Sequence, residues 1–151
     1  MQIVIYTDGA CIGNPGPGGW AAVVLNKGKE KKRIFGGEKL TTNNRMELVA
    51  AIKGLEYCID QDKKQTSLIK KITVYTDSAY LKDGITKWIK SWEKNNWKTS
   101  DKKNVKNKDL WKELQILVKL KEVDWKWIKG HSNDPMNDLA DRLAKAATPV
   151  Q

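Results

Sequence analysis

Two aspartates stand in nearly the same sequence context at separate points of the chain. Asp8 ends the run Ile5-Tyr6-Thr7-Asp8, and Asp77 ends the run Val74-Tyr75-Thr76-Asp77. Both runs are rich in β-branched and aromatic residues, which predicts a β-strand before each aspartate. If the two strands are parallel neighbours, both carboxylates lie at the edge of the sheet where open α/β sheets bind ligands. Carboxylates held that close repel each other, and a divalent cation would neutralise both.

Three more residues carry groups that could join this chemistry. Glu47 lies in the first turn of a predicted helix, and Asp141 lies in the last predicted helix. His131 is the only histidine and follows a predicted strand in a loop of small polar residues, which suits an accessible proton carrier. Sequence spacing alone does not bring these three residues and the two aspartates into one site.

Each of these residues also has a purely structural interpretation. Asp8-Gly9 could form a turn, and Asp77 could cap the helix that follows it. Asn44-x-x-Glu47 has the spacing of a helix capping box. An acidic residue such as Asp141 on a short helix is usually solvated, and a lone loop histidine often has no chemical role. The residues taken singly leave both interpretations open.

The chain of 151 residues is basic, and much of its charge is concentrated in one segment. Its 28 Lys and Arg against 18 Asp and Glu give a net charge of +10. Residues 82–112 contain ten lysines and four acidic residues, a net charge of +6, and four of the seven tryptophans: Trp88, Trp92, Trp97 and Trp111. Lysines attract phosphates and aromatic faces stack on bases, so the segment predicts contact with nucleic acid. A structural interpretation is that one helix has an apolar stripe with the lysines on its solvent-facing side, the stripe being Leu81, Ile85, Trp88, Ile89 and Trp92. Both interpretations can hold, because a tryptophan can pack below and stay exposed at its rim. The charge could also serve only solubility.

Several classes of protein are disfavoured. No apolar run approaches the roughly 20 residues of a membrane helix, and no basic-then-apolar leader opens the sequence. Cys11 and Cys58 form neither a disulfide framework nor a CxxC metal site. We therefore expect a cytoplasmic protein with no membrane partner and no disulfide-linked partner. Nothing resembles a heptad seam, so we also expect a monomer.

The elements that must position these groups follow from hydrophobic periodicity. Strands are expected over 2–8, over 20–25, in a run ending at 37, over 72–77 and over 123–128. Helices are expected over 46–59, over 78–92 with a break at Gly84, over 108–119, and from Asp134-Pro135 to Ala147. Residues 60–71 are expected to form a polar loop. This order predicts one mixed sheet, with three antiparallel strands first, later strands parallel to the first, and helices on its faces.

A set of motifs runs in order along almost the whole chain. It comprises Tyr6-Thr7-Asp8-Gly9-Ala10, Gly13-Asn14-Pro15-Gly16, Thr42-Asn43-Asn44-Arg45-Met46-Glu47-Leu48, Thr76-Asp77-Ser78, Trp92 through Trp97-Lys98-Thr99, Lys106-Asn107-Lys108-Asp109-Leu110-Trp111 and Gly130-His131 with Asp141. Together these motifs resemble type 1 ribonuclease H of the bacterial kind. The resemblance implies an α/β ribonuclease H fold, a five-stranded mixed sheet with helices on both faces, as a single catalytic domain over 1–148 with a short tail at 149–151. It also implies an endonuclease that cuts the RNA strand of RNA·DNA hybrids with little sequence preference and leaves 5′-phosphate and 3′-hydroxyl ends.

The resemblance further implies roles for individual residues. Four carboxylates match those that hold two Mg²⁺ ions in the family, with Mn²⁺ as an alternative: Asp8, Glu47, Asp77 and Asp141. His131 matches the loop histidine that assists water activation or product release. The implied substrate contacts are Asn14, Asn43 and Asn44 at the minor groove and the RNA 2′-hydroxyls, Thr42 and Asn107 at a DNA phosphate, Trp88 in the DNA channel, and Trp92, Lys94 and Lys98 in the basic protrusion over 87–103. Ala79 departs from the pattern, because some members carry an amide side chain there.

Two other functions stay open. A non-catalytic module could bind nucleic acid through the basic, tryptophan-rich segment alone. Integrases and junction resolvases share the plan of carboxylates on a sheet, and they cut DNA.

Overall fold

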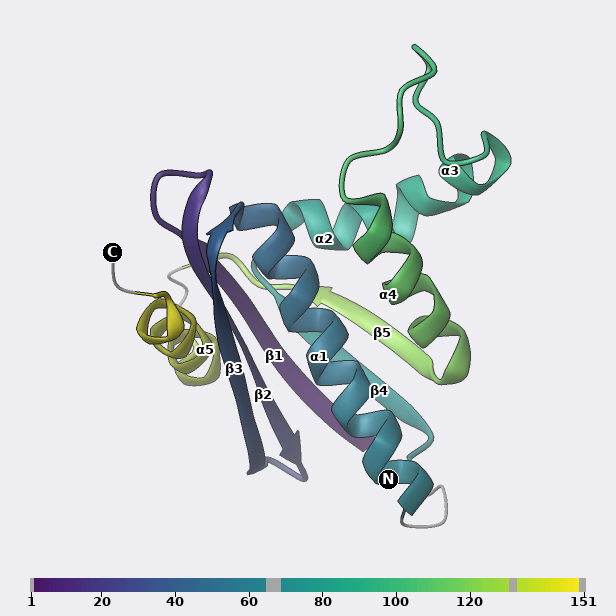
Figure 1. Ribbon diagram of the computed structural model, residues 1–151. Helices are drawn as coiled ribbons and strands as arrows, with labels where there is room; N and C mark the ends of the chain where they lie inside the picture. The colour runs from purple at the N-terminus through teal and green to yellow at the C-terminus, as the bar shows by residue number, and fades with distance from the viewer. Residues whose placement is uncertain (1, 65–68, 131–132, 150–151) are drawn as a thin grey trace.

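The computed structural model describes residues 2–64, 69–130 and 133–149 and contains one five-stranded sheet (Figure 1). Its strands are β1 (Gln2–Cys11), β2 (Gly16–Asn26), β3 (Lys29–Thr41), β4 (Lys71–Thr76) and β5 (Glu122–Trp127), in the order β3-β2-β1-β4-β5. The first three strands are antiparallel, and β4 and β5 run parallel to β1. The predicted mixed sheet is therefore confirmed.

Helices cover both faces of this sheet. They are α1 (Asn43–Lys64), α2 (Ala79–Asp83), α3 (Ile89–Lys94), α4 (Lys108–Leu120) and α5 (Pro135–Ala147). In Figure 1, α1 and α4 lie on one side of the sheet, whereas α5 lies against β1 and β2 on the other. Among the described residues, no helix combines the length and apolar character needed to cross a bilayer.

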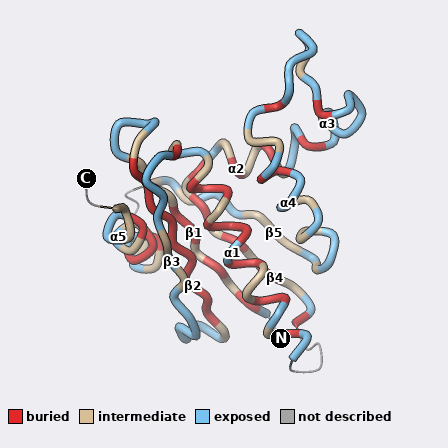
Figure 2. Tube along the Cα trace, viewed as in Figure 1, coloured by how far each residue is buried: buried red, intermediate tan, exposed pale blue. Residues whose placement is uncertain are grey.

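The core lies between α1 and the middle of the sheet. The side chains of Ile5, Val74, Leu48 and Leu55 are fully buried there, and they come from β1, β4 and α1. Residues 20–25 of β2 are buried without interruption, because α1 covers one face of this strand and α5 covers the other. Figure 2 shows the burial along β1, β2 and the inner side of α1. This packing fixes the strand ends from which the predicted acidic residues extend.

The first helix is longer than predicted, and the polar loop expected over 60–71 is wrong in its first part. Residues 60–64 continue α1. Asp62 is buried in this last turn, where it accepts a hydrogen bond from the Ile69 N–H at 2.7 Å and pairs with Lys121. The apolar periodicity fades after Ile59 because the contacts that hold this turn are polar.

The expected helix over 78–92 is interrupted at the predicted glycine. A π-helical turn over 84–88 separates α2 from α3. A Cβ atom on Gly84 would lie 2.0 Å from the ring of Trp111, so only glycine lets the chain pass this close to the buried tryptophan. The interruption therefore serves the packing of the basic segment onto α4.

Candidate active site

The carboxyl ends of two parallel strands place the paired aspartates side by side. β1 and β4 are in register up to Thr7 and Thr76, and each is followed by its aspartate. Asp8 does not form a turn, because β1 continues to Cys11 and Asp8 pairs with Ala21 of β2. Asp77 does not cap α2, since the Ser78 hydroxyl accepts the Leu81 N–H at 3.1 Å. Both structural interpretations of the aspartates are therefore wrong, and both carboxylates are available to the site.

The first turn of α1 brings Glu47 to the same place. The cap of α1 is Thr42, whose hydroxyl accepts the Arg45 N–H at 3.2 Å, so the capping-box interpretation of Glu47 is wrong. A Cβ on Gly9 would lie 2.6 Å from the backbone nitrogen of Glu47, and the missing side chain lets the helix approach β1 this closely.

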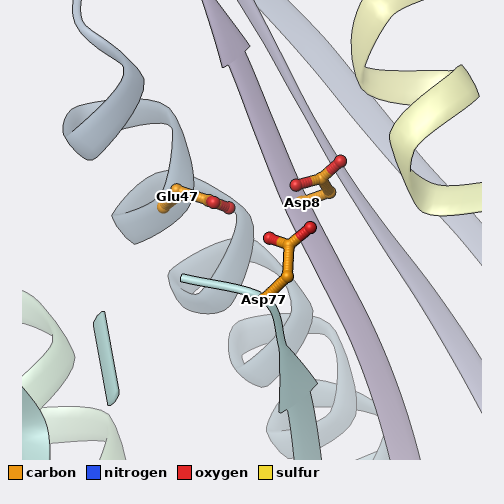
Figure 3. Close-up of side chains that lie close together, drawn as sticks. All are labelled: Asp8, Glu47 and Asp77. Carbon is orange, nitrogen blue, oxygen red and sulfur yellow. The ribbon is translucent and has the colours of Figure 1, made fainter. Parts of the chain in front are cut away.

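The three carboxylates converge on one point. One oxygen from each of Asp8, Glu47 and Asp77 lies within 4.8 Å of the other two. Figure 3 shows them extending toward one another from β1, α1 and the end of β4. Asp8 and Glu47 are each only 3% exposed. Water therefore screens little of the repulsion between the groups.

Burial and mutual repulsion make the ionised forms of these groups unfavourable. Burial raises the pKa of Asp8 to about 9, with the charges of Asp77 and Asp141 adding to the effect and the Gly9 backbone hydrogen bond opposing it. Burial also raises the pKa of Glu47 well above its usual range, and Asp8 and Asp77 raise it further. The pKa of Asp77 is raised as well, mainly by burial. A bound cation would reverse this preference by favouring the ionised forms.

Asp141 reaches the same pocket from α5. The pocket has a volume of about 420 Å³, and Asp141 lines it together with the three converging carboxylates. Its Oδ2 atom also pairs with Lys145, one turn later, at 3.0 Å. The start of α5 is fixed by Asp134, which accepts the N–H groups of residues 136 and 137 as the sequence predicted. All four predicted carboxylates thus share one pocket, with three of them in a tight cluster.

The donor set fits a hard divalent cation. Every group in the cluster is a carboxylate, the ligand type that Mg²⁺ and Mn²⁺ prefer. The Oε1 atom of Glu47 is buried and forms no hydrogen bond with any described residue. A buried carboxylate oxygen without a partner is costly unless something positive satisfies it. The residues therefore fit the metal that the sequence predicts.

Polar residues predicted to contact substrate surround this pocket. Asn43 and Asn44 line it at the start of α1. The Asn14 side chain accepts the Asn43 N–H at 2.8 Å, which ties the β1–β2 turn to the helix. Ala79 also lines the pocket, so the amide that some family members carry is missing at this wall.

Thr42 and Asn107, predicted to share a phosphate pocket, are linked by Arg45. The backbone N–H of Arg45 binds Thr42, and its guanidinium donates to the Asn107 side chain at 3.2 Å. The same guanidinium holds Asp109 through two hydrogen bonds of 2.9 and 3.1 Å. The sequence motifs contained Arg45 without indicating this role, because its partners lie more than sixty residues further along the chain.

The tryptophans of the basic segment are both core and surface. Trp111 is fully buried and Trp97 is 8% exposed. Leu81 and Ile89 of the predicted apolar stripe are buried, so that interpretation is confirmed for these two residues. Trp92 packs among the other three rings, with centroids 5.4–6.0 Å away, and Trp88 remains 37% exposed. The predicted contacts Lys94 and Lys98 are exposed, and Lys98 donates to Asn104 at 2.6 Å. A buried aromatic cluster therefore carries an exposed basic rim.

Two aromatic residues that the sequence did not single out also support the site. The Tyr80 hydroxyl lines the pocket side of α2 and accepts hydrogen bonds from Asn107 and Trp111, both at 3.0 Å. The Trp127 indole donates to the Asp77 carbonyl at 3.2 Å. A tyrosine directly after Asp77-Ser78-Ala79 and a tryptophan at a strand end were the available signals.

His131 lies outside the described residues. Its neighbour Gly130 lines the pocket, and a Cβ on Gly130 would lie 3.6 Å from Asp77 Oδ2.

Comparison with known proteins gives one consistent family. The sequence model of the RNase H family matches residues 1–148. The chain is 52% identical to a ribonuclease H of Wolbachia pipientis wMel over 146 residues, covering 97% of this chain and 94% of that protein. It is 50% identical to a ribonuclease H of Treponema denticola, covering 97% of each.

Solved structures share the fold. LC9-RNase H1, described as a type 1 RNase H with the type 2 active-site motif, superposes with a TM-score of 0.80 at 29% identity, covering 97% of this chain and 72% of that one. LC11-RNase H1, solved in complex with an RNA/DNA hybrid, gives a TM-score of 0.73 at 24% identity and covers 97% and 96%.

Proposed function

Because the chain belongs to the ribonuclease H family, we infer that it cuts the RNA strand of RNA·DNA hybrids. The observation that carries this function is the convergence of Asp8, Glu47 and Asp77 at one edge of the sheet. Clustered carboxylates that can hold divalent cations suit hydrolysis of a phosphodiester by water. We propose endonucleolytic cleavage with little sequence preference, leaving 5′-phosphate and 3′-hydroxyl ends.

We propose that Asp8, Glu47, Asp77 and Asp141 would together hold two divalent cations. Mg²⁺ is the proposed metal, and Mn²⁺ is the alternative. Bound divalent cations would supply an activated water and would neutralise charge on the departing 3′ oxygen. Glu47 lies on α1, Asp8 on β1 and Asp141 on α5, and Asp77 directly follows β4. Regular secondary structure therefore positions the four carboxylates before any ligand arrives.

The remaining residues position the substrate and move protons. Asn43 and Asn44 line the pocket, and Asn14 accepts a hydrogen bond from the Asn43 N–H. The amide groups of these three residues are the proposed contacts of the RNA 2′-hydroxyl. Thr42 and Asn107 are the proposed partners of a DNA phosphate. Their neighbour Arg45, whose charge is balanced by Asp109, holds the two residues in position.

The basic rim and the loop histidine complete the proposal. The exposed part of the Trp88 ring can contact the DNA strand, and the partly buried Trp92 packs against Trp88. Lys94 and Lys98 attract backbone phosphates. His131 carries a proton to or from the reacting oxygens, and its place next to Gly130 supports this role.

Cleavage of three labelled duplexes tests this function. The RNA·DNA hybrid, the RNA duplex and the DNA duplex are each incubated with Mg²⁺ and then with EDTA. We expect cleavage of the hybrid alone, in its RNA strand, and only with metal. Cleavage of DNA would indicate the integrase and resolvase type of reaction, whereas binding without cleavage would indicate a non-catalytic module.

A variant pair separates the acidic cluster from the rest of the chain. Asp8→Asn removes one clustered carboxylate, and Asp60→Asn removes an exposed carboxylate on α1. We expect Asp8→Asn to lose cleavage while retaining hybrid binding, and Asp60→Asn to cut like the parent. Retained cleavage in Asp8→Asn would contradict the metal assignment.

We further propose that residues 1–148 act as one catalytic domain with 149–151 as a tail, in the cytoplasm and as a monomer. The family match over 1–148 supports the domain limits. Sedimentation of the purified chain tests the oligomeric state, and cell fractionation tests the location.

A further inference from the structure

The net positive charge of this chain comes from two separate segments, and only one of them belongs to the proposed site. The segment over 82–112 has a net charge of +6. A second segment, Lys27-Gly28-Lys29-Glu30-Lys31-Lys32-Arg33, has five basic residues and one acidic residue, a net charge of +4. The rest of the chain contains equal numbers of acidic and basic residues. We call residues 27–33 the basic hairpin.

The basic hairpin joins β2 to β3 at the end of the sheet opposite the acidic pocket (Figure 1). Asn26 pairs with Lys29, and Lys27 and Gly28 form the turn between them with φ values of 54° and 76°. A two-residue turn with positive φ at both positions presents its flanking side chains on a defined backbone. Asp8 pairs with Ala21, five residues before Asn26 on β2, so the turn is about 17 Å or more from the pocket along the strand.

All side chains of the basic hairpin are exposed, and most lack an acidic partner (Figure 2). Glu30 pairs with Arg33. The four lysines form no ion pair with any residue that the structure describes. The hairpin therefore presents at least four uncompensated positive charges to solvent.

Protection of an edge strand is the simplest explanation for such lysines, and β3 is an edge strand. The opposite edge of the same sheet shows what protection requires. On β5, Lys126 lies 3.9 Å from Asp124, and Lys71 of β4 lies 3.6 Å from the same carboxylate. That edge is charged but balanced. Edge protection thus explains the presence of charges on β3 but not their single sign.

The composition of the hairpin identifies the kind of partner. Residues 27–33 contain no apolar side chain. Peptide and membrane partners are normally held by apolar contacts in addition to charge. A nucleic acid backbone can be held by lysines alone, through release of its counterions.

We propose that the basic hairpin is a second contact site for nucleic acid phosphates, and that it binds a stretch of backbone other than the one in the acidic pocket. The choice of nucleic acid rests on the proposed function. The site requires no metal and no acidic residue of the pocket. It would hold the enzyme on nucleic acid through the face that lies away from the cleavage site.

Binding of two matched variants to nucleic acid tests this proposal. The first variant carries Lys→Gln at 27, 29, 31 and 32. The control carries Lys→Gln at 53, 63, 64 and 70, four exposed lysines on α1 and the segment after it. Both variants have the same net charge, so a difference between them reports position rather than overall charge. Affinity for RNA·DNA hybrids of one and three helical turns is measured in EDTA across a salt series, with thermal unfolding to confirm the fold.

The hairpin variant should lose affinity for the longer hybrid by about tenfold or more at low salt. The slope of log affinity against log salt concentration should fall in magnitude by about 2–4, since each lost phosphate contact removes about 0.9. The control should change by about threefold or less. Equal slopes in the two variants would overturn the proposal. Binding of poly-glutamate, a mimic of an acidic protein, is measured in the same way. If the hairpin variant loses poly-glutamate binding while the salt dependence of its hybrid binding is unchanged, the proposal is overturned in favour of an acidic protein partner. Because EDTA prevents cleavage, these results do not depend on whether the chain cuts hybrids.

Discussion

Removing one clustered carboxylate should stabilise the metal-free protein. Asp8 is 3% exposed and its pKa is raised from 3.8 to about 9, so folding favours the protonated carboxyl. The protonated Asp8 carboxyl contributes its full stability below about pH 3.8, the pKa of the unfolded chain. That contribution is lost progressively as the pH rises toward about 9. At about 1.4 kcal/mol per pH unit, the loss at pH 7 reaches about 4 kcal/mol.

Asp8→Asn keeps the shape of the side chain and removes its charge. The three clustered groups share their protons, so one substitution should recover about 2–4 kcal/mol at neutral pH. For a domain of this size, that gain raises the melting temperature by about 5–15 °C. The gain should shrink toward about pH 4, where the native carboxyl is already protonated.

Thermal and urea unfolding in EDTA at about pH 5 and about pH 8 measure this difference. Asp60→Asn, an exposed carboxylate on the same helix as Glu47, is the control and should change little at either pH. Added Mg²⁺ should stabilise the parent protein more than Asp8→Asn, because the ligand binds only the folded state. Equal stability of the parent and Asp8→Asn at about pH 8 would refute the electrostatic reasoning.

Three further substitutions test the end of α1, the packing of the basic segment and the proposed substrate channel. Lys121→Met leaves the buried Asp62 without its charged partner and should lower the free energy of unfolding by about 2–3 kcal/mol, measured in urea. Gly84→Ala places a methyl group against the Trp111 ring and should destabilise the chain by about 1–3 kcal/mol, with weaker hybrid binding in a titration. Trp88→Ala removes a ring that is 37% exposed and should raise KM several-fold with less effect on kcat, while the melting temperature changes by only a few degrees; an unchanged KM would exclude this ring from the substrate channel.

The sequence predicted the parts of the fold that depend on regular periodicity. β4 and α4 were predicted to within one residue of their observed limits, because their burial follows the periods of a strand and of a helix. β2 was predicted too short and β3 was predicted to end too early, because their glycines read as turn residues. The end of α1 was missed because Asp62 reads as a polar loop residue. Its stabilising partner, Lys121, is nearly sixty residues away, and periodicity within one window carries no information about it.

Only the part of the site that follows from regular strand patterns was predictable from the residues themselves. The repeated strand-then-aspartate pattern indicated that Asp8 and Asp77 meet, since the pairing of parallel strands follows from topology. Glu47 and Asp141 could be added only through the family resemblance. The distance between α1 and β1 depends on the bare backbone of Gly9, and no spacing rule reports how closely two elements pack.

The two interpretations of the basic segment are not alternatives. A protruding segment with a net charge of +6 would repel itself unless packing held it in place. The buried ring of Trp111 supplies that packing, and its indole shares the Tyr80 hydroxyl with Asn107. Tyr80 in turn lines the pocket next to the carboxylates. The aromatic cluster therefore sets the position of the proposed phosphate site relative to the acidic pocket, and we expect substitutions in this core to weaken substrate binding as well as stability.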